Sequence, residues 1–145
     1  MPKKNKKAVE RELTSAECRV RSSGKEGSSA LCMLTKARGL LRQYFSGERV
    51  SFDLPLDMRY HTTFQQAVWQ AAAEIPFGET RSYGWIAKRI RNPKAVRAVG
   101  QALGANPVPL FIPCHRVISS TGTLGGFSGG IGMKEKLLEL EKVGR

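Results

Sequence analysis

The apolar side chains of this chain recur mainly at helical spacing, and this pattern predicts a mostly α fold. An amphipathic helix is predicted over 30–46, and Gly47 is placed to end it. A second helix is predicted over 64–75, where Thr63 and Gln66 have the spacing of a capping box. Two helices of this kind can bury one apolar face each.

Two short helices, over 83–90 and 93–103, are predicted next and have the order of a helix-turn-helix. Ser82 can cap the first helix, and Asn92 followed by Pro93 can start the second. The second helix should turn Val96, Val99 and Leu103 inward. It should present Lys94, Arg97 and Gln101 on its outer face, while the small residues Ala98, Gly100 and Ala102 would let the helix approach DNA closely, even in a narrow minor groove.

The run from 110 to 118 reads as a short buried strand with an unusual centre. Pro113, Cys114, His115 and Arg116 interrupt its apolar residues. A buried strand normally avoids proline, histidine and arginine, because proline removes a hydrogen-bond donor and the other two are costly to bury. A lone buried cysteine is usually structural, but these neighbours favour a reactive site.

The remaining segments define the predicted domain organisation. Residues 1–29 are basic and polar and are predicted to be a disordered arm. Residues 30–62 hold the first helix and a connecting loop, and residues 63–145 form the main domain. Within that domain a glycine-rich loop over 122–132 leads to a last helix over 133–143, whose core residues should be Leu137, Leu138 and Leu140.

The charge distribution points to nucleic acid. The net charge is +12, and no Asp or Glu occurs between 80 and 132, where seven Lys and Arg residues lie. Phosphate contacts require such cations. Three scattered cysteines and two histidines match no zinc spacing, so we expect no metal and no cofactor. The chain has no apolar run of the roughly 20 residues that a membrane helix needs, and no secretory signal is visible.

The chemistry of the thiol depends on its protonation. A cysteine acts as a nucleophile only as the thiolate, which a nearby base or positive charge favours. His115 is adjacent to Cys114, and a histidine base usually has a third group that orients it. Glu135, Glu139 and Glu141 are the only acids that follow Glu79, and spacing does not choose among them.

Several motifs of this sequence together resemble those of one known family. The run Pro113-Cys114-His115-Arg116-Val117 follows Asn106-Pro107-Val108-Pro109 and precedes a glycine-rich loop and Lys134-Glu135-Lys136-Leu137-Leu138. Over about 40–143 the chain resembles the O6-alkylguanine-DNA alkyltransferase family. The resemblance implies a winged-helix-like helix-turn-helix domain and a protein that transfers an alkyl group from guanine to its own cysteine, once and irreversibly.

The resemblance also implies roles for individual residues. The relay would run from Cys114 through a water to His115 and Glu141, and Tyr83 would donate a proton to the leaving oxygen. Asn106 would join the recognition helix to the thiol segment. The DNA contacts would come from Lys94, Arg97 (as the finger that replaces the extruded base), Ala98, Gln101, Arg116 and Tyr83 itself. The substrate pocket would be lined by Pro109, Val117, Gly125, Phe127 and Ser128.

The partner implied is double-stranded DNA with O6-alkylguanine, contacted in its minor groove by a monomer. We expect a cytoplasmic protein, on the nucleoid in a prokaryote or in the nucleus in a eukaryote. Two features depart from the family: Phe127 stands where many members have tyrosine, and the usual N-terminal α/β domain would be truncated or vestigial. A non-catalytic damage sensor of the alkyltransferase-like type and a Cys-His hydrolase of acyl substrates are the alternatives.

Overall fold

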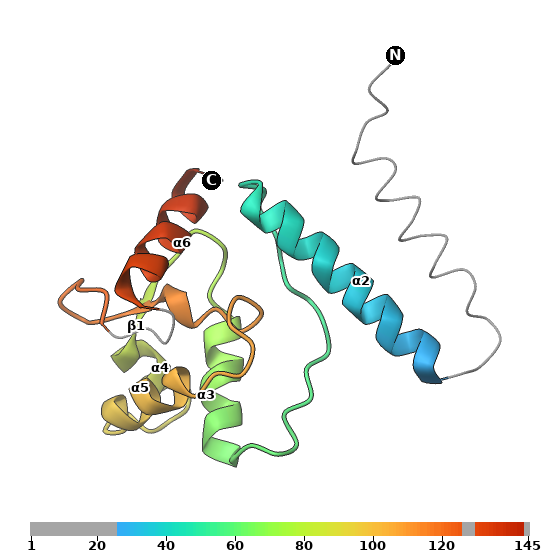
Figure 1. Ribbon diagram of the computed structural model, residues 1–145. Helices are drawn as coiled ribbons and strands as arrows, with labels where there is room; N and C mark the ends of the chain where they lie inside the picture. The colour runs from blue at the N-terminus through green and yellow to red at the C-terminus, as the bar shows by residue number, and fades with distance from the viewer. Residues whose placement is uncertain (1–25, 126–129, 144–145) are drawn as a thin grey trace. The chain divides into compact units, whose positions relative to one another are not determined.

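The computed structural model describes residues 26–125 and 130–143, and within them the fold is mostly helical (Figure 1). The chain divides into two compact units between Val50 and Ser51. The segment 51–62 therefore belongs with the main domain, although the sequence grouped it with the first helix. No described helix has the length and apolar character required to cross a membrane.

The first unit contains α2 (Glu26–Phe45), and its C-terminal end is capped by backbone hydrogen bonds. Gly47 has a φ of +83°, its N–H donates to Tyr44 O at 3.0 Å, and the N–H of Glu48 donates to Gln43 O at 3.1 Å. These two bonds make a Schellman motif, in which glycine takes the left-handed position at little cost. The predicted end of this helix is confirmed, but the predicted start is wrong: the helix begins at Glu26, so residues 26–29, which were assigned to a disordered arm, are helical.

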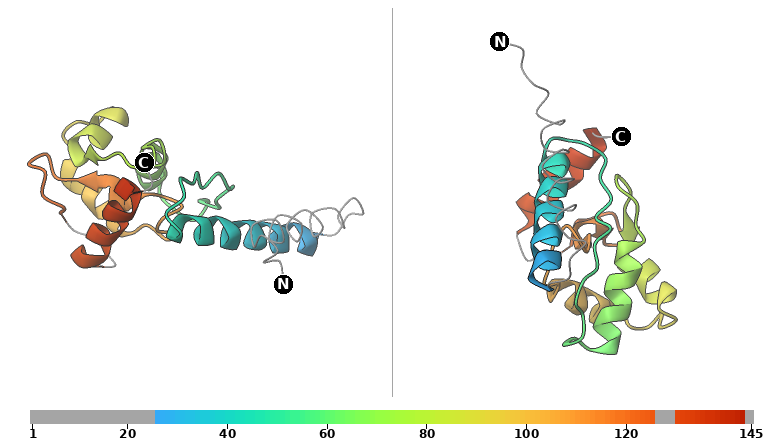
Figure 2. Two further views of the ribbon diagram at one scale, coloured as in Figure 1. Left: turned by 90° about the horizontal axis from the view of Figure 1, so that it is seen from above. Right: turned by 90° about the vertical axis from the view of Figure 1, so that its right-hand side faces the viewer.

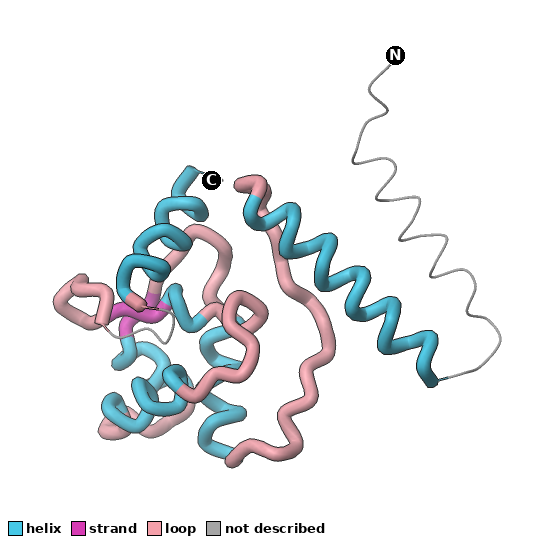
Figure 3. Tube along the Cα trace, in the orientation of Figure 1, coloured by secondary structure: helices cyan, strands magenta, loops and turns pink. Residues whose placement is uncertain are grey.

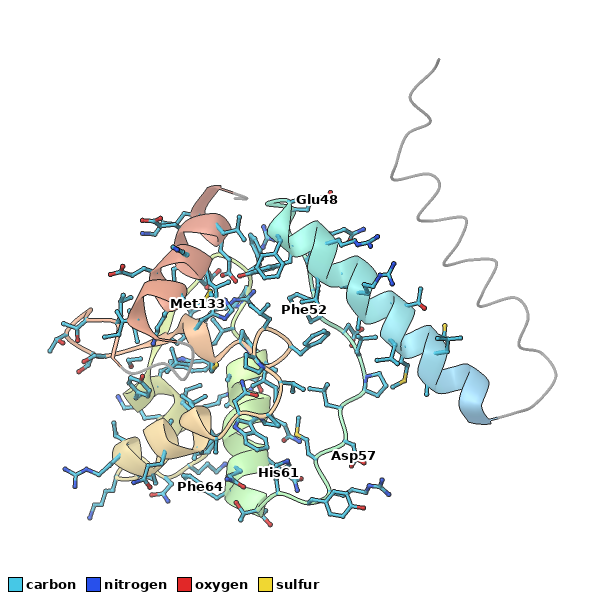
Figure 4. All side chains as sticks on the ribbon, in the orientation of Figure 1. Glu48, Phe52, Asp57, His61, Phe64 and Met133 are labelled. Carbon is cyan, nitrogen blue, oxygen red and sulfur yellow. The ribbon has the colours of Figure 1, made fainter. Side chains whose placement is uncertain are left out.

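In the second unit, residues 51–58 are extended and alternate between exposed and partly buried side chains. The ring of Phe52 lies 4.8 Å from that of Phe111, and the segment forms one wall of a groove of about 720 Å³ beside the following helix. Figure 4 marks Phe52, Asp57 and His61 along this stretch. Inward apolar residues therefore hold the segment to the domain without a sheet.

The next helix, α3 (Thr63–Ala73), starts one residue earlier than predicted. The capping box is made by Thr62 and Gln65, with both reciprocal hydrogen bonds at 3.1 Å, and not by Thr63 and Gln66. The side chain of Gln66 instead donates to the carbonyls of Met58 and His61, so it fastens the preceding loop. The sequence offers threonine at both positions, and this second set of bonds decides the register.

The helix-turn-helix is formed by α4 (Tyr83–Arg89) and α5 (Val96–Gly104). Ser82 caps α4 as predicted, with Trp85 N–H donating to its hydroxyl at 3.0 Å. The second helix begins later than predicted, because Asn92 O accepts from Ala95 N–H in a tight turn before the first α-helical bond forms. As a result Val96 is 41% exposed, which corrects its predicted inward position.

The core lies where α3, α4 and α5 meet beneath the thiol segment, and the main view and the rotated views show these helices together (Figures 1 and 2). Trp69 Nε1 donates to Ala102 O at 2.8 Å, and both residues are buried. Ala102 therefore packs in the core. The expectation that this small residue faces DNA is wrong. The buried residues of this cluster are Val68, Trp69, Ala71, Ala72, Ile75, Ile86, Ala87, Val99, Ala102, Leu103, Ile112, Cys114 and Val117.

A small parallel pair of strands joins the start of the helix-turn-helix to the thiol segment. Strand β1 (Arg81–Ser82) pairs with β2 (Val117–Ile118), with Arg81 opposite Val117 (Figure 3). The last helix, α6 (Ile131–Val143), packs against the turn at Cys114. Of its predicted core leucines only Leu137 is fully buried, and the other fully buried positions of α6 are charged.

Candidate active site

The thiol lies in a turn and not in the predicted strand. Residues Cys114–Arg116 form a single turn of 3₁₀ helix, η1, which leads directly into β2. Cys114 N–H donates to Ile112 O at 2.8 Å, and Arg116 N–H donates to Pro113 O at 3.0 Å. In such a turn neighbouring side chains are about 120° apart, whereas in a strand they point to opposite faces. Cys114 and His115 therefore do not point to opposite faces, as they would in the predicted strand.

Glu141 of α6 accepts hydrogen bonds from segments that are distant from it in the sequence. His115 Nε2 lies 2.6 Å from Glu141 Oε1, and both side chains are buried. The backbone N–H of Gly78, in the loop after α3, donates to Oε2 at 3.1 Å. Of the three glutamates that the spacing left open, Glu141 is therefore the one in contact with the histidine.

Arg116 supplies the charge that balances this buried carboxylate. Its Nε and Nη2 donate to Glu141 at 2.9 to 3.1 Å, and its Nη1 donates to Ile75 O at 2.8 Å. Only 6% of the residue is exposed. This corrects the expectation that Arg116 contacts DNA, because the residue is buried and all three nitrogens of its guanidinium group donate to internal acceptors.

The electrostatics of the pair fix the protonation of the histidine. Burial favours the protonated form of Glu141, but the hydrogen bonds from His115 and Arg116 outweigh it and lower the pKa of Glu141 to about 2. Burial lowers the pKa of His115, against the opposing effect of Glu141. A carboxylate only accepts, so Nε2 of the neutral ring carries the proton and donates it. The basic lone pair of the imidazole is then on Nδ1.

Asn106 connects the end of α5 to the thiol segment. Its Nδ2 donates to Ile112 O at 2.9 Å, and its Oδ1 accepts from Val108 N–H at 3.0 Å. The side chain is buried and also hydrogen-bonds the thiol, which lowers the pKa of Cys114 against the larger raising effect of burial. The hydrogen bonds expected of Asn106 are therefore present.

Lys134 is a site residue that the sequence reasoning missed. It is 0% exposed, and its Nζ donates to Val117 O at 2.6 Å and to Leu124 O. Its positive charge lowers the pKa of Cys114. A lysine among leucines reads as a surface position, and only its seven-residue spacing from Glu141, which is two helical turns, could have placed it inward.

Tyr83 lies at the start of α4, and two glycines that are distant in the sequence lie near its ring. A Cβ on Gly125 would lie 2.8 Å from the tyrosine hydroxyl, and one on Gly100 would lie 4.0 Å from the ring. Gly125 also has a φ of +66°. Burial raises the pKa of Tyr83, and the neighbouring thiolate charge of Cys114 adds to this, so the hydroxyl keeps its proton. The glycine-rich loop therefore makes room for Tyr83.

The other predicted residues are distributed between surface and core. Val117 is buried and Pro109 is exposed. Phe127 and Ser128 lie outside the described residues. The side chains proposed to contact DNA from α5 and the turn before it are all exposed, namely Lys94, Arg97, Ala98 and Gln101. Among residues 26–125 and 130–143, no three His, Cys, Asp or Glu side chains gather as a metal site would require.

The fold and the site together define a helix-turn-helix domain that carries a buried Cys-His-Glu arrangement. Residues 63–143 match the family model described as 6-O-methylguanine DNA methyltransferase, DNA binding domain. The chain belongs to this family.

Individual relatives agree with this assignment. The methylated-DNA–protein-cysteine methyltransferase of Mycobacterium tuberculosis is 57% identical over 102 residues, which are 70% of this chain and 61% of the relative. That of Haemophilus influenzae is 50% identical over 114 residues, or 78% of this chain and 63% of the relative. The chain thus spans somewhat less than two thirds of the length of these relatives.

A solved structure of the Mycobacterium tuberculosis protein OGT in complex with DNA superposes with a TM-score of 0.70 at 56% identity, covering 73% of this chain and 64% of that one. The structure of S. pombe Atl1 with damaged DNA containing O6-carboxymethylguanine gives a TM-score of 0.50 at 38% identity, covering 54% of this chain and 74% of that one.

Acid titration tests the role of Glu141. Its pKa falls from 4.5 to about 2 in the folded protein, so its stabilising effect is full above pH 4.5 and is lost as the pH falls toward 2. The loss is about 3 kcal/mol, at 1.36 kcal/mol for each pKa unit. Unfolding by urea at several pH values should show this loss. Glu141→Gln should abolish it and should be less stable at pH 7 by about 3 kcal/mol, since Arg116 stays buried without its partner.

The matched control is Glu135→Gln, on the exposed side of the same helix. It should leave both the stability at pH 7 and the acid-dependent loss unchanged. An acid-dependent loss that persists in full in Glu141→Gln would show that another carboxylate is responsible.

Removal of the buried ammonium tests Lys134. In Lys134→Met the thiolate loses a neighbouring positive charge, so the pKa of Cys114 should rise above its value in the unaltered protein. The measurement is the pH dependence of Cys114 modification by iodoacetamide, with folding checked by circular dichroism. Lys136→Met, at an exposed position of α6, should leave the profile unchanged. An identical profile for a folded Lys134→Met protein would contradict the electrostatic role.

Proposed function

We propose that the protein repairs DNA by transferring the alkyl group of O6-alkylguanine to Cys114. The observation that carries this proposal is that Cys114 shares a 3₁₀ turn with His115, whose Nε2 lies 2.6 Å from the buried carboxylate of Glu141. Family membership supports the same reaction, since the curated relatives are methylated-DNA–protein-cysteine methyltransferases. The chain spans only part of the length of those relatives, so the activity is a proposal for this chain.

The proposed step is a displacement at the alkyl carbon. His115 Nδ1 accepts the thiol proton through a bridging water, and the imidazolium that forms is stabilised by Glu141. The thiolate then forms a C–S bond while the C–O6 bond breaks, and the electron pair of that bond goes to the guanine oxygen. The product is a thioether that water does not cleave easily, so each molecule acts once.

Tyr83 is the proposed proton donor to the leaving guanine oxygen. Its raised pKa keeps the hydroxyl protonated near neutral pH, as a general acid requires. Gly125 and Gly100 leave the space in which the ring stands. The proton lost by the thiol to His115 is matched by the proton that Tyr83 gives to guanine, and later exchange with solvent restores both groups.

The flipped base would lie in a pocket formed by Pro109, Val117, Gly125, Phe127 and Ser128. The carbonyl of Val117 already accepts from Lys134, yet a carbonyl oxygen has two lone pairs and can accept a second hydrogen bond from guanine. Lys134 thereby fixes the direction in which this carbonyl points. Pro109 is exposed and would form the outer rim.

Duplex DNA would be held in its minor groove by the exposed face of α5. Lys94, Arg97, Ala98 and Gln101 supply this face, and Arg97 would fill the stack after the base leaves. Extrusion is required because the alkylated oxygen is buried in the duplex. The complex of the Mycobacterium tuberculosis relative with DNA supports a DNA partner. We place a monomer on chromosomal DNA in the cytoplasm or the nucleus.

Mass spectrometry of the thiol peptide tests the proposal. After incubation with duplex DNA containing O6-methylguanine, the peptide that holds Cys114 should gain one methyl group, with no more than one methyl transferred per protein molecule. Cys114→Ser should show no gain, because an alcohol is a far weaker nucleophile at neutral pH.

Binding to the alkylated DNA with no methyl gain on a folded protein would instead establish the non-catalytic sensor. Turnover of an activated ester with no methyl gain would establish a hydrolase.

Two substrates separate chemistry from base extrusion at Arg97. Arg97→Ala should slow transfer from alkylated duplex DNA roughly tenfold or more, since the gap in the stack is left unfilled and unstacking costs a few kcal/mol. Transfer from the free O6-alkylguanine base should be unchanged, because no extrusion is needed. The comparison is of second-order rate constants, with Arg59→Ala, an exposed arginine before α3, as the control. An equal fall with both substrates would exclude the finger role.

A further inference from the structure

The cations of the acid-free stretch fall into two groups, and only one of them is available to a partner. Arg81 pairs with Glu79 at 2.6 Å, Arg89 pairs with Glu74 at 2.7 Å, and Arg116 pairs with Glu141. The other four are exposed and have no ion pair with any residue that the structure describes. These four, which we call the turn cations, are Lys88, Arg91, Lys94 and Arg97.

All four turn cations lie within ten residues, from the last turn of α4 to the first turn of α5. This is the connection of the helix-turn-helix, the part that precedes the proposed recognition helix. Lys94 and Arg97 already belong to the proposed DNA contacts. Arg91 and Lys88 extend the same uncompensated positive charge backward along the chain, to the end of α4.

Arg91 sits at a position where arginine is unfavourable for the fold. Its φ is +61°, in the left-handed region. Its N–H donates to Lys88 O at 3.0 Å, and the N–H of Asn92 donates to Ala87 O at 2.9 Å. These are the two bonds of a Schellman motif, and Arg91 occupies the position that usually requires glycine. A side chain with a Cβ is strained there.

The same chain uses glycine in the same motif elsewhere. At the end of α2 the equivalent position is Gly47, with a φ of +83° and the same pair of hydrogen bonds. The two caps therefore have one geometry and differ in the residue that adopts it. At the first cap the chain has the residue that favours the fold, and at the second it has a long cation directed to no internal partner among the described residues.

We propose that Arg91 contacts a DNA phosphate and that the strain at the end of α4 is retained for this contact. The proposal rests on the proposed function and extends it, since it assigns a backbone contact to a residue outside α5. The contact is independent of sequence and of damage, because it is made to a phosphate. It would hold the turn against the strand while α5 enters the groove.

The test is the salt dependence of binding to undamaged duplex DNA, followed by fluorescence anisotropy. One lost phosphate contact lowers the slope of log K against log salt by about 0.9. Arg91→Gln should show this decrease and bind roughly fivefold more weakly near 0.1 M salt. Arg91→Lys should keep the slope of the unaltered protein. Arg91→Gly should show the decrease and also melt at a temperature higher by roughly 2 to 5 °C, because the strain is relieved.

The matched control is Lys136→Gln, which removes one exposed charge from α6 and should leave the slope unchanged. An unchanged slope in Arg91→Gln, or an equal decrease in Lys136→Gln, would overturn the proposal. Methyl transfer from the free base to Cys114 of the unaltered protein is measured alongside. If that transfer occurs and the slope in Arg91→Gln is unchanged, only the Arg91 contact is wrong; if transfer fails, the proposed function is wrong irrespective of the slope.

Discussion

The rest of the site depends on the hydrogen bonds and the ion pair made by the buried carboxylate of Glu141. A charge in the interior is tolerated only when hydrogen bonds and an opposite charge replace its hydration. Here the donors come from two segments, the loop at Gly78 and the turn that holds His115 and Arg116, and Arg116 also donates to Ile75 O just after α3. Each donor would be costly to leave unpaired, so the carboxylate fixes the position of both segments, and Arg116 links them to the end of α3.

This constraint explains how the turn that holds Cys114 is kept in place inside a small helical domain. The thiol itself contributes to the core formed by α3, α4 and α5, and it is only 6% exposed. Burial alone makes the thiol less acidic, which would make it a poorer nucleophile. The polar groups around it, Asn106 and Lys134, act in the opposite direction. Burial remains the larger effect on the pKa of Cys114, and these two fixed polar neighbours oppose it.

Much of the fold could be predicted from the sequence, because local signals and tertiary packing agree there. The caps at Ser82 and Gly47 have strong local preferences, and the structure contains both. The start of α5 could not be predicted in this way. Asn92 and Pro93 are good starting residues for a helix, yet they form a separate turn and Val96 is left exposed. The sheet also escaped prediction, since two-residue strands carry no periodicity.

The site was predictable in its residue types but not in its orientation. The proline, histidine and arginine around Cys114 marked this segment as a candidate site, while the same arginine was assigned to the surface because arginine is seldom buried. Whether this arginine is buried depends on its partner in α6, and the sequence spacing did not choose among the three glutamates there. Arg116 is buried because Glu141 and the Ile75 carbonyl together use its fork of donors.

The last helix shows why hydrophobic pattern alone was misleading. In α6 the inward positions 134, 137 and 141 are a lysine, a leucine and a glutamate, two turns from end to end. The two charges have opposite signs and different targets: Lys134 lies near the thiol and Glu141 holds the imidazole. Transfer of a proton from Cys114 to His115 creates a negative charge at the first and a positive charge at the second. In the proposed relay, one helix face would therefore stabilise both products of this transfer. Replacing its two charges by leucines would improve the hydrophobic pattern of α6 but would remove this stabilisation.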